Sequence, residues 1–196
     1  MENALYQLKT CGRPLDGMSY ILTCDDGSVL VIDGSYDQYD ADHLLTWLKK
    51  ITGEEKPTVA AWFLTHAHPD HTFALKGMGE RHNRELTVQS VVYAFPEEAV
   101  YANIDPRVLP ENRQLEAAID RFDSCRRVTP KRGDVFTYGS VQVKVLMTYR
   151  DLFCKERKDK ITVNDTSTVY RVEIGGQKIL FPGDIQKAGD EAILEL

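Results

Sequence analysis

The segment Leu64-Thr65-His66-Ala67-His68-Pro69-Asp70-His71 places three imidazoles and one carboxylate within six consecutive positions. The 196-residue chain has only five histidines, so three of the five lie in this one segment. Imidazole nitrogens and carboxylate oxygens are the ligands that zinc takes when thiolates are absent. The segment therefore predicts a metal site with His66, His68, Asp70 and His71 as candidate ligands.

The histidine segment begins directly after an apolar run. Residues 58–64 (TVAAWFL) are apolar except for the first, and this pattern predicts a buried strand. Beyond the strand, His66 and His68 are two positions apart, so they point to the same side of an extended chain. Pro69 then changes the direction of the backbone. We therefore expect two neighbouring ions, one on His66 with His68 and the other on Asp70 with His71.

A further carboxylate comes late in the chain, in Phe181-Pro182-Gly183-Asp184. Glycine permits a sharp turn of the backbone, and the turn presents Asp184 at the end of an apolar strand. We expect the Asp184 carboxylate to bridge both ions. The other two histidines, His43 and His82, are expected to be ordinary surface or packing residues.

The rest of the chain alternates between strand and helix patterns. Strand, loop, helix and strand around the histidine segment form a βαβ unit, which predicts an α/β fold with a partly parallel sheet. The second half is dominated by alternating strand patterns, and the charged residues 150–160 are expected to be a surface loop. The predicted strands are 4–9, 19–24, 28–32, 58–64, 86–94, 134–137, 141–147, 168–174 and 178–181, and the predicted helices are 42–51, 71–81, 96–102, 113–122 and 189–196.

Composition limits the classes of partner. The formal net charge is −6, so a general electrostatic attraction to nucleic acid is not favoured, although a locally basic groove is not excluded. The basic pairs Arg126-Arg127 and Lys131-Arg132 are expected to be solvated. The chain has neither an N-terminal targeting pattern nor a run of about 18 apolar residues, so we expect a cytoplasmic protein that does not span a membrane. Its four cysteines are too widely spaced to form a thiolate metal cage.

The metal motifs resemble those of metallo-β-lactamase-fold hydrolases. In that family H-x-H-x-D-H follows a strand, as residues 66–71 do here, and a late Gly-Asp turn corresponds to Gly183-Asp184. Val31-Ile32-Asp33-Gly34 is similar to an early strand of the family that ends in Asp-Gly. Residues 164–167 together with 169–174 resemble the hydrolase domain of bacterial DNA-uptake channel proteins. The resemblance covers residues 5–196.

This resemblance implies a metallo-β-lactamase-like αββα sandwich, with two mixed sheets flanked by helices, as a single domain over residues 1–196. It implies a zinc hydrolase, with one or two ions, in which a metal-bound hydroxide attacks an ester, amide or phosphodiester. The substrate would be a small molecule or a phosphodiester. Asp70 would orient the attacking water as well as bind metal, and Asp33 and Thr65 would fix the histidine ligands. Iron or manganese could replace zinc.

Two departures from the family pattern bear on the site. Family members carry another histidine before the late aspartate, whereas here Asn164 or Asp165 stands where that ligand would fall, so Asn164 is a further candidate ligand. The family also has a last histidine beyond one more helix and strand, whereas this sequence ends inside that helix. We therefore expect a truncated piece of a longer protein, lacking its last helix and strand.

Two other functions remain open from the sequence. Two histidines and one carboxylate with open positions also suit a non-haem iron oxygenase, although His68 argues against it, because the iron branch of the family replaces this histidine by glutamate. The fold could also persist as a catalytically inactive binding or structural domain. The sequence names neither the substrate nor the oligomeric state.

Overall fold

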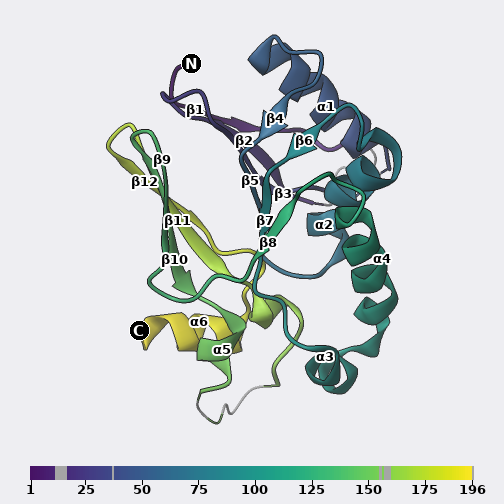
Figure 1. The fold of residues 1–196 in the computed structure, drawn as a ribbon. Coiled ribbons are helices and arrows are strands. Elements are labelled where there is room, and N and C mark those ends of the chain that lie inside the picture. The colour runs from purple at the N-terminus through teal and green to yellow at the C-terminus, as the bar shows by residue number, and fades with distance from the viewer. Residues whose placement is uncertain (12–16, 37, 155, 157–159, 196) are drawn as a thin grey trace.

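The computed structural model describes residues 1–11, 17–36, 38–154, 156 and 160–195. Two β-sheets face each other, helices cover the outer side of the larger sheet, and two short helices lie at one end of the smaller sheet (Figure 1). The larger sheet has the order β1-β2-β3-β5-β7-β8 and the smaller sheet has the order β12-β11-β10-β9. This arrangement confirms the expected αββα sandwich.

The six-stranded sheet combines antiparallel and parallel pairs. Strands β1 to β3 are antiparallel, and β3, β5, β7 and β8 are parallel. Its strands are β1 (Ala4–Gln7), β2 (Ser19–Thr23), β3 (Val29–Asp33), β5 (Ala61–Phe63), β7 (Ser90–Val92) and β8 (Arg126–Val128). Every residue of β3, β5 and β7 is buried, because helices cover one face of this sheet and the second sheet covers the other.

The four-stranded sheet is antiparallel throughout and comes from the second half of the chain. Its strands are β9 (Val135–Tyr138), β10 (Val141–Met147), β11 (Val169–Ile174) and β12 (Gln177–Phe181). Buried and less buried residues alternate along β10, so one face of the sheet packs inward. Val143, Val172 and Phe181 from this sheet contact Leu30 and Phe63 of the larger one, which forms the core between the sheets.

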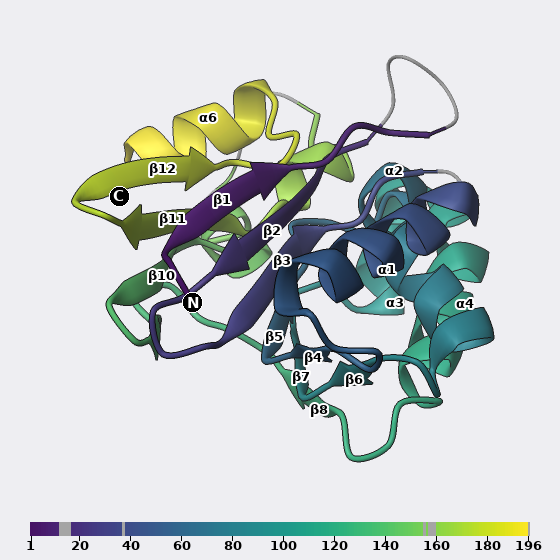
Figure 2. The same cartoon turned by 90° about the horizontal axis from the view of Figure 1, so that it is seen from above.

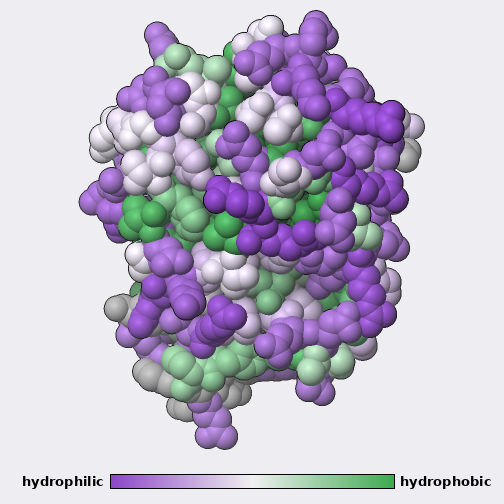
Figure 3. All heavy atoms as spheres, in the orientation of Figure 1, coloured by the Kyte–Doolittle hydropathy of each residue, from purple (hydrophilic) through white to green (hydrophobic). Residues whose placement is uncertain are grey.

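Helices from residues 38–119 cover the outer face of the six-stranded sheet (Figures 1 and 2). They are α1 (Gln38–Thr52), α2 (Pro69–Gly77) with its π-helical extension Met78–His82, α3 (Glu98–Ile104), the 3-10 turn Pro106–Val108 and α4 (Leu109–Ile119). Leu44 and Leu48 of α1 pack with Val31 and Trp62 of the sheet. Polar side chains cover most of the face seen in Figure 3.

Two further helices, α5 (Tyr149–Leu152) and α6 (Lys187–Leu194), lie where β10 ends and β11 begins. Leu152 and Ala192 contact Met147 and Val169 there. A 3-10 turn, Asn164–Thr166, leads into β11. Within the described residues, no helix is long and apolar enough to cross a membrane. The cytoplasmic location stays a prediction.

The structure corrects several expected boundaries. The strand expected over residues 58–64 is divided at Ala60 into β4 (Thr58–Val59) and β5, and β4 pairs with β6 (Thr87–Val88) in a separate small sheet. The strand expected over residues 86–94 is divided at Gln89 in the same way. In both, a single residue leaves the ladder as the chain passes from the small sheet to the large one. Local apolar patterns carry no signal for such a change of partner.

Two segments differ more strongly from expectation. Arg126 and Arg127 are exposed, as expected, but they belong to edge strand β8, which was not predicted because its short charged sequence lacks an apolar alternation. Helix α2 begins at Pro69 rather than at residue 71, because proline is compatible with the first turn of a helix. The expected loop over residues 150–160 begins in α5, and residues 155 and 157–159 lie outside the described part of the chain.

Candidate metal centre

The ends of three strands bring the candidate ligands to one edge of the sandwich. Asp33 is the last residue of β3, and His66 follows shortly after β5, which is parallel to β3. Carboxyl ends of parallel strands meet at the same edge of a sheet, where α/β proteins place their ligands. Asp184 follows β12 of the other sheet. The Thr168 amide donates to the Thr65 carbonyl (2.8 Å), which joins the two sheets at this point.

Three of the five predicted ligands form one cluster. A potential ligand atom from each of His66, His71 and Asp184 lies within 4.8 Å of the others. His71 Nε2 is 3.4 Å from Asp184 Oδ1. Two buried imidazoles and a partly exposed carboxylate from distant parts of the chain therefore share one small space.

The other two predicted ligands lie on the margin of this cluster. His68 Nδ1 is 3.0 Å from His66 Nε2, so these nitrogens either share a proton or face the same ligand position. Asp70 Oδ2 is 3.7 Å from His71 Nε2. The arrangement with two ions, each on its own pair of residues, stays a prediction.

A buried carboxylate orients the histidines of the cluster. Asp33 accepts hydrogen bonds from the Thr65 amide (2.8 Å) and the Thr65 hydroxyl (2.9 Å), and its Oδ2 is 2.8 Å from His71 Nδ1. The Thr65 hydroxyl is also 3.1 Å from His66 Nδ1. Because the Nδ1 atoms are engaged here, the Nε2 atoms of both rings are left for a ligand. Asp33 and Thr65 thus both contact the histidines of the cluster, and their role in fixing the metal ligands stays a prediction.

The two buried histidines have opposite protonation tendencies. Burial lowers the pKa of His66 well below 6.5, and the nearby His71 and His68 lower it further. Burial would also lower the pKa of His71, but the carboxylates of Asp33 and Asp184 outweigh it and raise that pKa to about 10. The hydrogen bond with His71 is the main cause that lowers the pKa of Asp184. The metal-free cluster therefore holds an imidazolium between two carboxylates.

The turn that presents Asp184 requires glycine at position 183. Gly183 has φ of +61°, in the left-handed region. A Cβ atom at Gly183 would lie 2.6 Å from Ser167 Oγ and 2.9 Å from Thr65 Cβ. The Ser167 hydroxyl oxygen also accepts a hydrogen bond from the Asp184 amide (3.3 Å). Both the backbone conformation and the close packing exclude a side chain here.

Asn164 and Asp165, the two candidates for the missing histidine position, have different surroundings. Burial lowers the pKa values of His66 and His68, and the neighbouring Asn164 side chain partly opposes this effect. Asn164 Oδ1 is buried without a hydrogen-bond partner of good geometry among the described residues. Asp165 Oδ1 accepts the amides of Gln186 and Gly189, and its Oδ2 accepts the amide and hydroxyl of Thr162. Asp165 is therefore fully engaged in joining two loops, whereas Asn164 offers a free oxygen toward the cluster.

These residues fit a divalent cation. Two imidazole nitrogens and a carboxylate oxygen are a usual catalytic ligand set, in which an open position remains. The buried Asn164 Oδ1 lacks a partner, and buried polar atoms are almost always paired. A cation in the cluster would also lie between the Asp184 and Asp70 carboxylates, which have no Lys or Arg ion-pair partner within the described chain.

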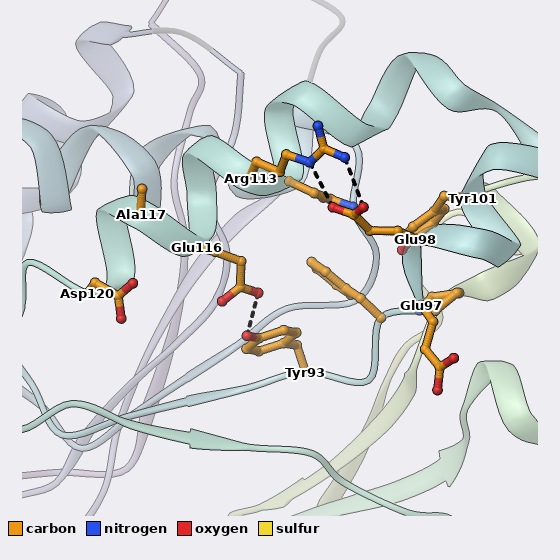
Figure 4. Close-up of a pocket in the computed structure, with 11 residues that line it drawn as sticks. Tyr93, Glu97, Glu98, Tyr101, Arg113, Glu116, Ala117 and Asp120 are labelled. Atoms are coloured by element: carbon orange, nitrogen blue, oxygen red, sulfur yellow. Dashed lines mark hydrogen bonds and ion pairs between the residues drawn. The ribbon is translucent and has the colours of Figure 1, made fainter.

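A separate hollow of about 490 Å³ lies beside α3 and α4 and contains none of these residues. Figure 4 shows two interactions that span it, the Arg113–Glu98 ion pair and the hydrogen bond from Tyr93 to Glu116. Of the two remaining histidines, His43 lies near Trp47 and His82 pairs with Asp42 and Glu85. The His/Asp cluster therefore lies outside this hollow.

Comparisons with known proteins agree with the fold. A family model described as the metallo-beta-lactamase superfamily matches residues 12–196. ComE operon protein 3 from Bacillus subtilis (strain 168) is 27% identical over 136 residues, which are 69% of this chain and 15% of that protein. Zinc-bound PqqB from Methylobacterium extorquens has a TM-score of 0.54 at 17% identity, covering 86% of this chain and 52% of that one. The metallo-beta-lactamase fold protein YhfI from Bacillus subtilis has a TM-score of 0.50 at 11% identity, covering 87% and 55%.

Proposed function

Because the chain belongs to the metallo-beta-lactamase superfamily, we propose that it is a metal-dependent hydrolase of ester, amide or phosphodiester bonds. It would hold one or two divalent cations, with zinc as the expected metal and manganese as a substitute. The chain spans only 15% of the curated relative and about half of the two solved relatives, so its activity is argued from its own residues.

The observation that carries this proposal is the convergence of His66, His71 and Asp184 within 4.8 Å. These residues come from two sheets and from distant parts of the chain, and the Asp33–Thr65 network aims both imidazoles into one space. Building a buried imidazole cluster is costly for folding, because like charges and desolvation oppose it. Such an arrangement is typical of a functional site rather than of a structural one.

The roles of the chain's own residues follow from this geometry. A divalent cation, when bound, lowers the pKa of a nearby water and polarises the bond to be cleaved. His66, His71 and Asp184 would hold the cation, with His68 and Asn164 at the margin. Asp70, which is 32% exposed and 3.7 Å from His71 Nε2, is placed to accept a proton from the attacking water on Oδ2. Asp33 keeps the Nε2 atom of His71 turned toward the site throughout.

The test combines metal analysis with two chemically different substrates. The purified protein would be analysed for bound metal and assayed with bis(p-nitrophenyl) phosphate and with a lactone. We expect about one or two equivalents of zinc and turnover of at least one of the two substrates. His66→Ala and Asp184→Asn should lose both metal and activity, whereas His43→Ala, a histidine outside the cluster, should keep both. A zinc-loaded protein that cleaves neither substrate would instead support a binding or structural domain.

One observation favours a second candidate, a non-haem iron oxygenase. The cluster of His66, His71 and Asp184 is itself a set of two histidines and one carboxylate, which suits Fe(II) with open positions. Expression in iron-supplemented and zinc-supplemented media separates the two functions. Preferential incorporation of iron, with oxygen consumption in the presence of a reductant, would replace the hydrolase proposal. His68 supports the hydrolase proposal, since the iron branch of the family has glutamate in place of this histidine.

A further inference from the structure

We propose that the hollow beside His68 is the binding site for a phosphate group of the substrate, with Arg107 and Lys160 as its cationic contacts. This inference rests on the proposed hydrolase function and names the substrate class of the same site. The hollow has a volume of about 430 Å³ and reaches from His68 and Asn164 to the 3-10 turn at Pro106–Val108 and to residues 160–163. Its inner end is thus the margin of the metal centre, and its size suits a small-molecule substrate.

Arg107 is held in place for contact with an anion. Asp105 accepts three hydrogen bonds from it, from the backbone amide (3.0 Å), Nε (2.8 Å) and Nη2 (2.7 Å). These bonds lower the pKa of Asp105 to about 2, so the pair stays ionised at any working pH. A guanidinium has five N–H donors. Two of them go to Asp105, and the other three have no partner among the described residues. The side chain is 88% exposed and therefore accessible.

Lys160 also lines the hollow, on the segment that leads to Asn164. Its ammonium has no ion-pair partner in the part of the chain that the structure describes. Among the described residues that line the hollow, Asp105 is the only carboxylate beside Arg107 and Lys160, in a chain whose net charge is −6. The charge balance here is therefore opposite to that of the whole protein.

The hollow beside α3 and α4 has the opposite charge balance to the hollow beside His68 (Figure 4). Its lining has four carboxylates, Glu97, Glu98, Glu116 and Asp120, and only one arginine, Arg113. Nε and Nη2 of Arg113 are bound to Glu98 in the same bidentate manner as those of Arg107 to Asp105. An anion would be repelled there. Arg113 is consequently a matched control, with the same residue type and pairing in an acidic setting.

Phosphate suits this site better than a carboxylate does. Its oxygens can accept hydrogen bonds from arginine and from a second cation at once. Arg107 and Lys160 come from different segments, and a group with several acceptor oxygens can contact both. The phosphate of a small phosphodiester or phosphomonoester would then lie between these cations and the metal centre.

The test is calorimetric binding of inorganic phosphate to the zinc-loaded protein, with acetate as the carboxylate probe. We expect Arg107→Ala and Lys160→Ala each to raise the phosphate Kd about tenfold, which is the usual effect of losing one charged hydrogen bond. Arg107→Lys should have a smaller effect, and Arg113→Ala should have none. Phosphate should also bind more tightly than acetate.

Several results would overturn the inference. The first is an absence of phosphate binding, and the second is an unchanged phosphate Kd in both Arg107→Ala and Lys160→Ala. The third is a rise of the phosphate Kd in Arg113→Ala that equals the rise in Arg107→Ala. The fourth is acetate binding that is as tight as phosphate binding and depends equally on Arg107. Ester hydrolysis measured on the same samples separates the two proposals. If the protein hydrolyses esters but its phosphate Kd is unchanged in Arg107→Ala and Lys160→Ala, this inference alone is rejected. Dependence of phosphate binding on both residues without any hydrolysis would reject the proposed function alone.

Discussion

Asp33 Oδ2 lies 2.8 Å from His71 Nδ1, and the two side chains are only 1% and 2% exposed. Asp33 also has φ of +51°, a conformation that non-glycine residues rarely adopt. Strained residues of this kind persist where the surrounding structure holds them, and they concentrate at functional sites. Strand β3 thus ends in a strained residue whose carboxylate sets the orientation of a candidate metal ligand.

Asp33→Asn should weaken zinc binding about 10- to 100-fold, the usual effect of losing a group that orients a metal ligand. Asparagine keeps the size of the side chain but removes the charge that raises the pKa of His71 and holds its Nε2 toward the site. A competition titration with a zinc chelator measures the change. Asp26→Asn is the control, because Asp26 is an exposed carboxylate that accepts the Ser28 amide. Unchanged zinc affinity in Asp33→Asn would refute the orienting role.

Zinc binding between pH 7 and 9 should release a proton from His71. Its pKa is raised to about 10 in the metal-free protein, and zinc requires the neutral ring. Zinc affinity should therefore rise with pH by up to about tenfold per unit. His66, with a pKa well below 6.5, is already neutral and should contribute no proton. Calorimetry in two buffers of different ionisation enthalpy counts the protons, and a count of zero at pH 8 would contradict the prediction.

The same raised pKa predicts an opposite trend for the stability of the metal-free protein. A group whose pKa rises on folding contributes stability that is complete below its unfolded value of about 6.5 and is lost as pH increases through the folded value. The contribution of His71 should thus disappear between pH 6.5 and about 10. Urea unfolding of the metal-free protein and of Asp33→Asn across this range checks the trend, because the variant should lose less stability as pH rises.

Gly183→Ala should destabilise the protein by more than about 2 kcal/mol and also weaken zinc binding. A left-handed conformation costs an alanine about 1 to 2 kcal/mol by itself, and the new Cβ would also collide with Ser167 and Thr65. Gly176→Ala is the matched control, because Gly176 has φ of +76° but a Cβ added there would meet no atom within 4 Å. It should lose only the conformational part and keep zinc affinity. Equal losses in the two variants would argue against the close packing at Gly183.

Asp165→Asn should lower stability by about 2 to 3 kcal/mol and weaken zinc binding, although Asp165 is no ligand. Its oxygens accept four hydrogen bonds that tie Thr162, two residues before Asn164, to the segment that follows Asp184. An amide nitrogen cannot accept, so buried donors lose their partner. Asp134→Asn is the control, since exposed Asp134 accepts only the Lys131 amide through its side chain. Loss of stability with unchanged zinc affinity would limit Asp165 to a purely structural role.

The sequence by itself determined the histidine segment, the strand before it and the glycine turn before Asp184. These features are local, because residue spacing along a strand or turn fixes which side chains share a face. Family membership and the αββα sandwich followed from the same motifs. The order of strands was only partly readable, since β8 has a charged sequence and the chain leaves one sheet for another at Ala60 and Gln89.

Only the tertiary structure decided which distant groups meet. The family resemblance implied that Asp33 would fix a histidine ligand, but only the structure identifies that ligand as His71. It also separates the two candidates at the missing histidine position, because Asp165 accepts hydrogen bonds from Thr162, Gln186 and Gly189 whereas Asn164 Oδ1 has no such partner. It also brought Arg107 and Lys160, which are distant in sequence, into the lining of one hollow. Contacts between remote segments depend on how the two sheets pack and on the register of their strands. These are properties of the whole fold, and the residue types along one segment do not encode them.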